Sequence, residues 1–260
     1  MDSWLGSYKR RDSLPEVQGQ VIPMTLSLCS LLSSGKDSNY ALLWAVTHGF
    51  RLRCIATFES RSRESWMLQT INTELARLQA ESIGVPHYSY EVSGLKELEV
   101  DEIKNALDSI VSREEVEYVT TGALRSDYQR IRFEQVFNEL SLKPVNPLWW
   151  VDQPRYMRLL ARSGLEFVIT RISAYGLPPG LLGRIVGPEE VEVIVKASMV
   201  YGFNPAFEGG EAETLVVYSP LYRKRICFKA KKSIRGDVAE LDIIDYWLSD
   251  PGDSGCYVVI

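Results

Sequence analysis

An α/β fold built around a parallel sheet is predicted by three features of the sequence. Over residues 25–125, short apolar segments alternate with amphipathic segments of helical spacing, and glycines follow several of the helical ones. Parallel strands need helical crossovers between them, so this alternation indicates a parallel sheet covered by helices. The pattern becomes less regular after residue 125, which predicts a second, smaller α/β unit.

The spacing of apolar residues predicts the strands and helices of the first half. Continuous apolar residues predict a buried strand at 25–32, whereas Leu52, Cys54, Ala56 and Phe58 alternate as in a half-buried strand. Helical segments end at glycines such as Gly84, which suits a helix C-terminus. We therefore expect strands at 25–32, 51–58, 87–92 and 116–120, and helices at 36–48, 65–83, 96–112 and 127–140.

The second half carries weaker signals. Residues 176–188 hold several glycines and prolines and are expected to form a loop, and residues 250–255 are turn-like. Helices are expected at 154–163 and 189–201, and strands at 166–172, 214–218, 225–228 and 238–246. The resulting division is a loose N-terminal extension at 1–23, a first domain at 24–125, a second domain at 126–250 and a tail at 251–260.

Composition excludes several classes of protein. Lys and Arg total 29 against 34 Asp and Glu, a net charge of −5, which argues against a protein that grips nucleic acid. No apolar run approaches the roughly 18 residues that span a membrane. The four cysteines do not cluster, so neither a zinc site nor a disulfide framework is expected. Cys29 and Cys54 are interpreted as buried packing thiols, and the cytoplasm as the compartment.

The segment Ser33-Ser34-Gly35-Lys36-Asp37-Ser38 lies between the first strand and the first helix. A helix N-terminus offers free N–H groups and a positive dipole end, which suit phosphate, and Lys36 adds a cation. The segment does not match the phosphate loop G-x-x-x-x-G-K-[S/T], since Ser30 and Asp37 occupy two of its defining positions. An ordinary strand-to-helix turn with an incidental Lys-Asp pair is the alternative.

The segment closely resembles the SGGKDS pyrophosphate-binding loop of the PP-loop ATP pyrophosphatases, with Ser34 in place of the second glycine. If that position needs a positive φ, serine costs roughly 1 kcal/mol or more there. Further motifs follow in order, and with the loop they resemble the diphthine–ammonia ligase family over about residues 25–220. They are the segments 64–70 (ESWMLQT), 122–130 (GALRSDYQR), 173–177 (SAYGL), 182–184 (LGR) and 208–215 (EGGEAETL).

The resemblance implies an adenine nucleotide alpha hydrolase-like first domain that binds ATP and a second domain that binds the other substrate. The implied activity is amidation of diphthine, a modified histidine of translation elongation factor 2, through an acyl-adenylate, with AMP and pyrophosphate as products. Ammonium is the nitrogen donor and Mg²⁺ the expected metal, with Asp37 as its candidate ligand. The oligomeric state is left open, and a homodimer is one arrangement that the sequence allows.

The expected site residues fall into three groups. Lys36 and Asp37 are the catalytic candidates. The expected nucleotide contacts are Ser33, Ser34, Gly35, Lys36, Asp37, Ser38, Thr57, Phe58, Glu59, Gly122 and Arg125. The expected contacts of the second substrate are Trp66, Gln69, Asp127, Tyr128, Arg130, Tyr175, Glu208, Gly209, Gly210, Glu211, Glu213 and Thr214.

Several of these residues have a plainer interpretation. Phe58 also fits core packing, and Arg132, a further candidate for an anion, also fits a solvated helix face. The aromatic residues could pack in the core or at a rim instead of contacting a quaternary nitrogen by cation–π interaction. Gln69 stands where the family usually has histidine, which puts a proton-transfer role there in doubt.

Glu208, Glu211 and Glu213 form the acidic cluster expected to face a cationic substrate, and Gly209-Gly210 marks either crowded backbone or a plain turn. Two other functions remain open. One is another PP-loop enzyme, which amidates a small molecule or modifies tRNA, and the other is a nucleotide sensor without catalysis. The unclustered cysteines and the net charge of −5 weigh against tRNA thiolation.

Overall fold

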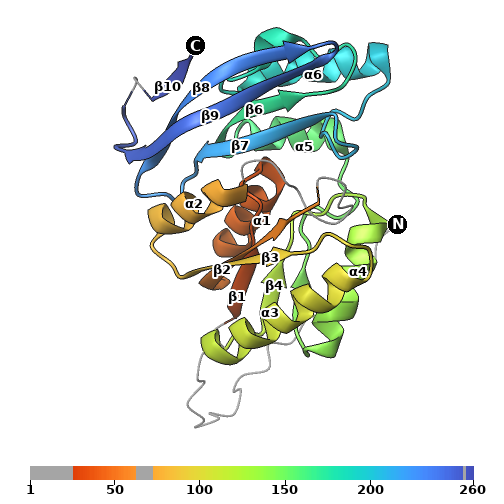
Figure 1. Ribbon diagram of the computed structural model, residues 1–260, viewed down its shortest axis with the longest axis vertical. Helices are drawn as coiled ribbons and strands as arrows, with labels where there is room; N and C mark the ends of the chain where they lie inside the picture. Colours follow the sequence, from red (N-terminus) through yellow and green to blue (C-terminus); the bar gives the residue numbers. More distant parts are fainter. Residues whose placement is uncertain (1–25, 63–72, 254–255) are drawn as a thin grey trace, which may run out of the picture.

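The computed structural model describes residues 26–62, 73–253 and 256–260, and within them the strands form two five-stranded sheets (Figure 1). The predicted extension at 1–23 lies outside the described residues. The fold class predicted from the sequence is confirmed: one sheet is parallel and covered by helices, and a second sheet follows it in the chain. None of the helices in the described part of the chain is long and apolar enough to cross a membrane.

The first sheet is parallel throughout, with the strand order β3-β2-β1-β4-β5. The chain leaves β1 toward β2 on one side and later returns to β4 on the other, so the strand order reverses at β1. In open α/β sheets, ligands bind beyond the carboxyl ends of the strands at such a reversal. Its strands are β1 (Ser27–Leu31), β2 (Arg51–Ser60), β3 (His87–Val92), β4 (Tyr118–Thr120) and β5 (Lys143–Val145).

Helices cover both faces of this sheet. One face packs against α3 and α4, in a core that includes Phe58, Ile103 and Phe137. The other face packs against α1 and α2, where Leu42 and Ile55 are buried. The helices and the short 3₁₀ segment η1 are α1 (Lys36–Thr47), η1 (Thr73–Leu75), α2 (Ala76–Ile83), α3 (Leu98–Glu114) and α4 (Asp127–Glu139).

The second sheet, with the order β10-β8-β9-β6-β7, is antiparallel except for the β10–β8 pair. Helices α5 and α6 pack in its core, and α1 and α2 lie between the two sheets (Figure 1). Its elements are α5 (Gln153–Leu160), β6 (Glu166–Ile172), η2 (Pro179–Leu181), α6 (Pro188–Tyr201), β7 (Ala212–Tyr218), β8 (Arg225–Arg235), β9 (Val238–Ser249) and β10 (Tyr257–Val259).

Several elements differ from the sequence predictions. β5 was not predicted, because it is only three residues long and contains Pro144, which a strand tolerates at the edge of a sheet. This strand pairs with β4, so the first sheet continues past the expected boundary near residue 125. β8 extends to Arg235, beyond the predicted end at residue 228, because it pairs with β9 along its whole length although most of its side chains after Ala230 are exposed. β10 lies within the segment predicted as a tail.

The interpretation of the cysteines was wrong. The structure pairs Cys29 with Cys54 and Cys227 with Cys256 as disulfides. Cys29 and Cys54 are 25 residues apart in the sequence, but they are register partners on the adjacent strands β1 and β2. Cys256 lies beside β8, where its carbonyl accepts the N–H of Phe228. Strand pairing, which cysteine spacing does not reveal, therefore brings the sulfur atoms together.

Candidate functional site

A cavity of about 330 Å³ lies beyond the carboxyl ends of β1 and β4, where the strand order reverses. This volume is typical of a small-molecule site. One wall comes from the first sheet and α1, another from α4, and a third from the loop before β7. The lining residues are Leu31, Leu32, Ser33, Lys36, Asp37, Ser38, Ala56, Phe58, Thr121, Gly122, Ala123, Gln129, Phe133, Phe207, Glu208, Gly210, Ala212, Glu213 and Thr214.

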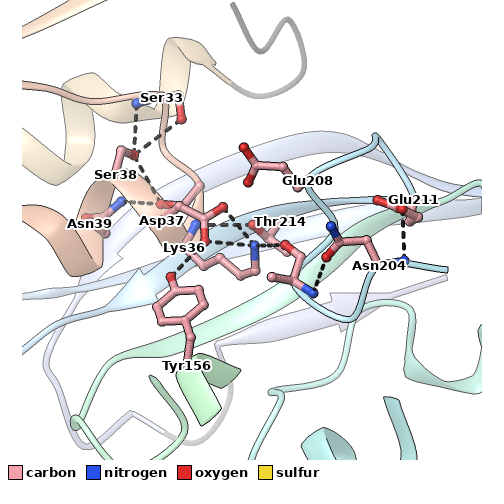
Figure 2. A network of polar contacts seen from close by, with 12 residues as sticks. Ser33, Lys36, Asp37, Ser38, Asn39, Tyr156, Asn204, Glu208, Glu211 and Thr214 are labelled. Carbon is pink, nitrogen blue, oxygen red and sulfur yellow. Dashed lines mark hydrogen bonds and ion pairs between the residues drawn. The ribbon is translucent and has the colours of Figure 1, made fainter. Parts of the chain in front are cut away.

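The serine-rich loop forms the N-terminal end of α1, as the sequence predicts. Gly35 is the N-cap residue, and its carbonyl accepts the first helical hydrogen bond, from the N–H of Asn39. The Ser38 hydroxyl accepts the N–H of Ser33 at 3.2 Å (Figure 2). Thr214 on β7 accepts the N–H of Lys36 at 3.1 Å. The loop is thereby held by both sheets, with Ser33, Lys36 and Ser38 on the cavity.

Ser34 adopts the left-handed backbone conformation, with φ 66°. Its carbonyl accepts the N–H of Val216 and the amide of Gln79, both at 3.0 Å, which fixes this conformation. The side chain is completely buried, and its hydroxyl has no hydrogen-bond partner among the residues that the structure describes. Glycine would suit this position on both counts, as the sequence comparison with the SGGKDS loop suggested.

A polar network behind the loop supports it. Asn39 donates to the carbonyl of Gly35 and to the side chain of Gln79, and Tyr222 donates to Asn39 at 2.7 Å. Burial raises the pKa of Tyr222 well above 10, so the hydroxyl keeps its proton and remains a donor. None of these three supporting side chains was predicted from the sequence, because they come from three separate elements that meet only in the fold.

Replacing Ser34 with glycine is expected to stabilise the protein. Removing the unpaired buried hydroxyl should contribute about 1 kcal/mol, and removing the strained Cβ about 1 kcal/mol more. Ser34→Ala separates the two contributions, since alanine loses the hydroxyl but keeps the Cβ at positive φ. Urea unfolding should rank Ser34→Gly above Ser34→Ala and both above the parent chain. A glycine variant less stable than the parent would contradict this account.

The buried Lys36 and the partly exposed Asp37 are joined in an ion pair. The Lys36 Nζ lies 2.8 and 2.9 Å from the two carboxylate oxygens of Asp37 and 2.6 Å from the carbonyl oxygen of Ala206 (Figure 2). Tyr156 on α5 donates its hydroxyl to Asp37 Oδ1 at 2.7 Å. Burial is the main cause that raises the pKa of Tyr156 well above 10, so it too remains a donor. A residue of the second half therefore orients a carboxylate of the loop.

Glu208 and Glu213 give the cavity an acidic wall. Both line it, and burial raises the pKa of each carboxyl above 4.5. Two contacts oppose the rise in the pKa of Glu208: the hydrogen bond that it accepts from the N–H of Arg125, and the positive charge of Lys36. The positive charges of Lys36 and Arg171 likewise oppose the rise in the pKa of Glu213. Two carboxylates near one lysine favour a cationic occupant of this part of the cavity.

Glu211 lies differently from the other two glutamates. Its carboxylate accepts the N–H groups of Asn204 and Gly209, at 3.0 and 2.7 Å, and does not line the cavity. Backbone donors of its own loop occupy Glu211, so in this structure only Glu208 and Glu213 of the acidic cluster line the cavity, and a substrate contact of Glu211 stays a prediction. Gly210 lines the cavity with φ 80°, and a Cβ on Gly209 would lie 2.9 Å from Glu211 Oε1. Both interpretations of the glycine pair hold: the backbone is twisted and crowded, and it forms a turn.

Of the residues expected at the end of β2, only Phe58 lines the cavity. Neighbouring strand residues face opposite sides of a sheet, which separates Thr57 and Glu59 from Phe58. The Thr57 hydroxyl donates to the carbonyl of Leu32 and contacts His87, and Glu59 accepts from Ser89. Phe58 also packs in the core beneath the cavity, as its alternative interpretation predicts, and its contact with a nucleotide stays a prediction.

Gly122 lines the cavity, where it permits a close backbone contact. A Cβ at Gly122 would lie 2.5 Å from the backbone nitrogen of Ser38 and 2.6 Å from the carbonyl carbon of Asp37. The loop after β4 therefore packs directly on the first turn of α1. Arg125, three residues later, contributes its N–H to Glu208, while its guanidinium stacks 5.2 Å from the ring of Trp150.

The residues expected on α4 do not line the cavity. Arg130 pairs with Asp127 and Glu134, and Arg132 lies over the ring of Tyr128 and pairs with Glu97. Gln129 and Phe133 of the same helix line the cavity instead. Tyr175 is 75 % exposed, packs on Tyr201 and does not line the cavity. Trp66 and Gln69 lie outside the described residues.

The structure also brings unpredicted residues to the cavity. Phe207 lies beneath the Lys36 ammonium, at 5.4 Å from Nζ to the ring centre, and has φ 66°. Gln129 lies within the segment 122–130 that the sequence singled out, and this position was the available signal; Thr121 directly precedes that segment. Phe207 and Tyr156 carried no comparable signal, because one precedes its motif and the other belongs to an ordinary amphipathic helix.

Asp37 could hold one metal contact. A carboxylate offers about four lone-pair positions. Three are used here, two by Lys36 and one by Tyr156. The remaining lone pair of the Asp37 carboxylate could bind Mg²⁺, which prefers oxygen ligands such as carboxylates, water and phosphate.

Replacing Glu213 with glutamine is expected to stabilise the protein at neutral pH. Because burial raises the folded pKa above the usual 4.5, the folded state holds the proton more tightly than the unfolded state. The stability from this group is full below about pH 4.5 and is lost as the pH rises through the folded pKa. Glutamine avoids that loss, so unfolding free energies from urea titrations should favour the variant at pH 7 and converge near pH 4. The exposed Glu74→Gln should show no such convergence; a Glu213→Gln chain less stable at pH 7 would contradict the prediction.

The comparisons with known proteins agree with this architecture. A family model described as the diphthamide synthase N-terminal domain matches residues 27–144, and the model of the C-terminal domain matches residues 152–246. Diphthine–ammonia ligase of Rattus norvegicus is 30 % identical over 228 residues, covering 80 % of this chain and 85 % of that protein. The Homo sapiens enzyme of the same name is 30 % identical over 220 residues, covering 77 % and 82 %.

The parallel sheet, its reversal point and the loop at α1 define an ATP-binding enzyme of the PP-loop class. The chain belongs to the diphthine–ammonia ligase family. Its enzyme class is therefore that of ligases that form C–N bonds.

Proposed function

We propose that this chain amidates the carboxylate of diphthine on translation elongation factor 2 with ammonium, at the expense of ATP, and so forms diphthamide. One observation supports it most: a helix N-terminus of the kind that suits phosphate and an acidic wall share one cavity. The first suits the triphosphate, and the second suits cationic partners, namely ammonium and the trimethylammonium group of diphthine. The family relationship supplies the identity of the substrates.

ATP would lie along the wall formed by the first sheet and α1. Leu31, Phe58 and Phe133 offer an apolar surface for adenine. Ser33, Lys36 and Ser38 would contact the pyrophosphate portion, with the N–H groups of α1 behind them. Magnesium, held in part by Asp37, would neutralise triphosphate charge. These contacts align the α-phosphate with the incoming carboxylate, which is the main contribution that positioning makes to such a transfer.

The reaction has two transfers. A carboxylate oxygen of diphthine attacks the α-phosphorus, the bond to the β-phosphate oxygen breaks, and pyrophosphate leaves with the electron pair. Ammonium loses a proton, its nitrogen lone pair attacks the acyl carbon, and the bond from that carbon to the AMP oxygen breaks. A second proton leaves the nitrogen as the amide forms, so one ammonium yields one amide and two protons. Lys36 would stabilise the negative charge that develops on the phosphates.

Phe207, which the sequence did not suggest, offers its ring to a small cation in the cavity, and the tyrosines suggested for the quaternary nitrogen of diphthine do not line it. Tyr128 stacks with Arg132 and Tyr175 lies outside the cavity, whereas the Phe207 ring forms part of the cavity wall near Glu208. The reaction needs no nucleic acid or membrane, and we place it in the cytoplasm, where the elongation factor works.

The direct test combines the purified chain with diphthine-bearing elongation factor 2, ATP, Mg²⁺ and ammonium. Pyrophosphate and AMP should form in equal amounts, and peptide mass spectrometry should show the carboxylate converted to the carboxamide. Omitting ammonium should stop amide formation. Nucleotide binding without turnover would favour the sensor, and turnover that requires tRNA would favour another PP-loop enzyme; either result overturns the proposal.

A further inference from the structure

The Lys36 ammonium occupies a complete binding site for an –NH₃⁺ group. Its Nζ contacts the Ala206 carbonyl at 2.6 Å and both Asp37 oxygens at 2.8 and 2.9 Å, and it lies 5.4 Å from the centre of the Phe207 ring. The lysine side chain is only 2 % exposed. A carbonyl, a carboxylate and an aromatic face are the groups that bind ammonium cations.

The loop that carries two of these groups is rigidly held. Glu211 accepts the N–H of Asn204, and the Asn204 side chain accepts the N–H of Ala206 at 2.9 Å (Figure 2). On the other side, Tyr156 holds Asp37 through Oδ1. The acceptors of the ammonium group are therefore positioned by contacts that do not involve Lys36, so the site should keep its shape when that side chain moves.

The charge around the site exceeds what one lysine neutralises. The carboxylates of Asp37, Glu208 and Glu213 line the same cavity as the Lys36 ammonium, and Lys36 acts electrostatically on both glutamates. If Lys36 turns its charge toward the triphosphate, the acceptors at Ala206 and Asp37 lose their only ammonium partner among the described residues. Buried acceptors without a donor are unfavourable, so another small cation would bind there.

We propose that the ammonium substrate binds at the position of the Lys36 Nζ, between the Ala206 carbonyl, the Asp37 carboxylate and the Phe207 ring. This inference rests on the proposed function and adds the location of one substrate. An ammonium ion has the same charge and N–H donors as the lysine head group and fits the same acceptors. Binding requires Lys36 to have moved to the phosphates, so ATP binds before ammonium. Glu208 and Glu213, in the same cavity, would accept the proton that ammonium loses before attack.

Kinetics of Phe207→Leu test the ring. Losing a desolvated cation–π contact should raise the KM for ammonium about 5-fold or more. The KM for ATP should stay within about 2-fold. Hydroxylamine, which is mostly uncharged at neutral pH and intercepts acyl-adenylates, should react with the variant as with the parent chain. Phe58→Leu is the matched control, and it should raise the KM for ATP and leave that for ammonium. Equal KM values for ammonium in parent and Phe207→Leu would overturn the proposal.

A binding measurement tests the site without turnover. In Lys36→Ala the acceptors are exposed to added cations, so ammonium chloride should raise the Tm of this variant more than that of the parent. Methylammonium should act similarly, whereas tetramethylammonium chloride at the same concentration, which has no N–H donor, should not. Equal responses to all three salts would overturn the proposal. Failure of the proposed function would instead appear as absent pyrophosphate formation, with this salt-specific stabilisation intact.

Discussion

Replacing Lys36 with methionine is expected to reduce turnover by about 10²–10³-fold, the usual effect of losing one preorganised charge-stabilising donor. Methionine keeps much of the side-chain volume but neither donates nor carries charge. The variant would lack the cation closest to the start of α1, and it would leave the Ala206 carbonyl and Asp37 without their shared donor. Stability should also fall, by about 1–3 kcal/mol for the unpaired buried groups.

The measurement is pyrophosphate release at saturating substrates, together with urea unfolding. Lys229→Met is the matched control, because Lys229 is exposed on β8 and does not line the cavity. It should leave both quantities near those of the parent. A folded Lys36→Met chain with turnover within about 3-fold of the parent would show that Lys36 is not part of the phosphate site.

Replacing Gly122 with alanine is the second change with a large expected effect. The added methyl group would lie 2.5 Å from the backbone nitrogen of Ser38, a contact with main chain that no rotamer change relieves. The loop after β4 and the first turn of α1 must then separate, at a cost of about 1–3 kcal/mol, typical of overpacking. Because that turn presents Ser33 and Ser38 to the cavity, the KM for ATP should rise about 10-fold or more.

Gly180→Ala provides the comparison, since a Cβ at Gly180 meets nothing within 4 Å. Its urea midpoint and its KM for ATP should match those of the parent. An unchanged KM for ATP in Gly122→Ala, with the fold intact, would mean that the loop after β4 does not position the nucleotide site.

The fold was largely predictable, because its signals are local. Apolar alternation predicted β2, and helical spacing with a following glycine predicted α1 and α2; the C-cap of α2 is Gly84, with φ 85°. β5 and β10 escaped prediction, since three-residue edge strands exist only through their pairing with β4 and β8. Strand pairing also explains the disulfides, which join cysteines 25 and 29 residues apart.

The candidate site was predictable where one short segment carries it. The loop from Ser33 to Ser38 combines a strand end, a helix start and a cation within six residues, and it lies at the cavity. The sequence predicted the position of the acidic cluster only in part. Glu208 and Glu213 line the cavity, while Glu211 accepts backbone N–H groups, a difference that depends on how the loop folds over its own chain.

The sequence by itself determined the parallel α/β architecture, the loop that begins α1 and the family of this protein, because each depends on local periodicity or on contiguous motifs. Only the tertiary structure decided which side chains share the cavity. It placed Phe207 and the Ala206 carbonyl around the Lys36 ammonium and Tyr156 against Asp37, although the residues of each pair lie 119 to 171 positions apart. Such contacts arise from the packing of two sheets on α1, and no local pattern in the chain encodes them.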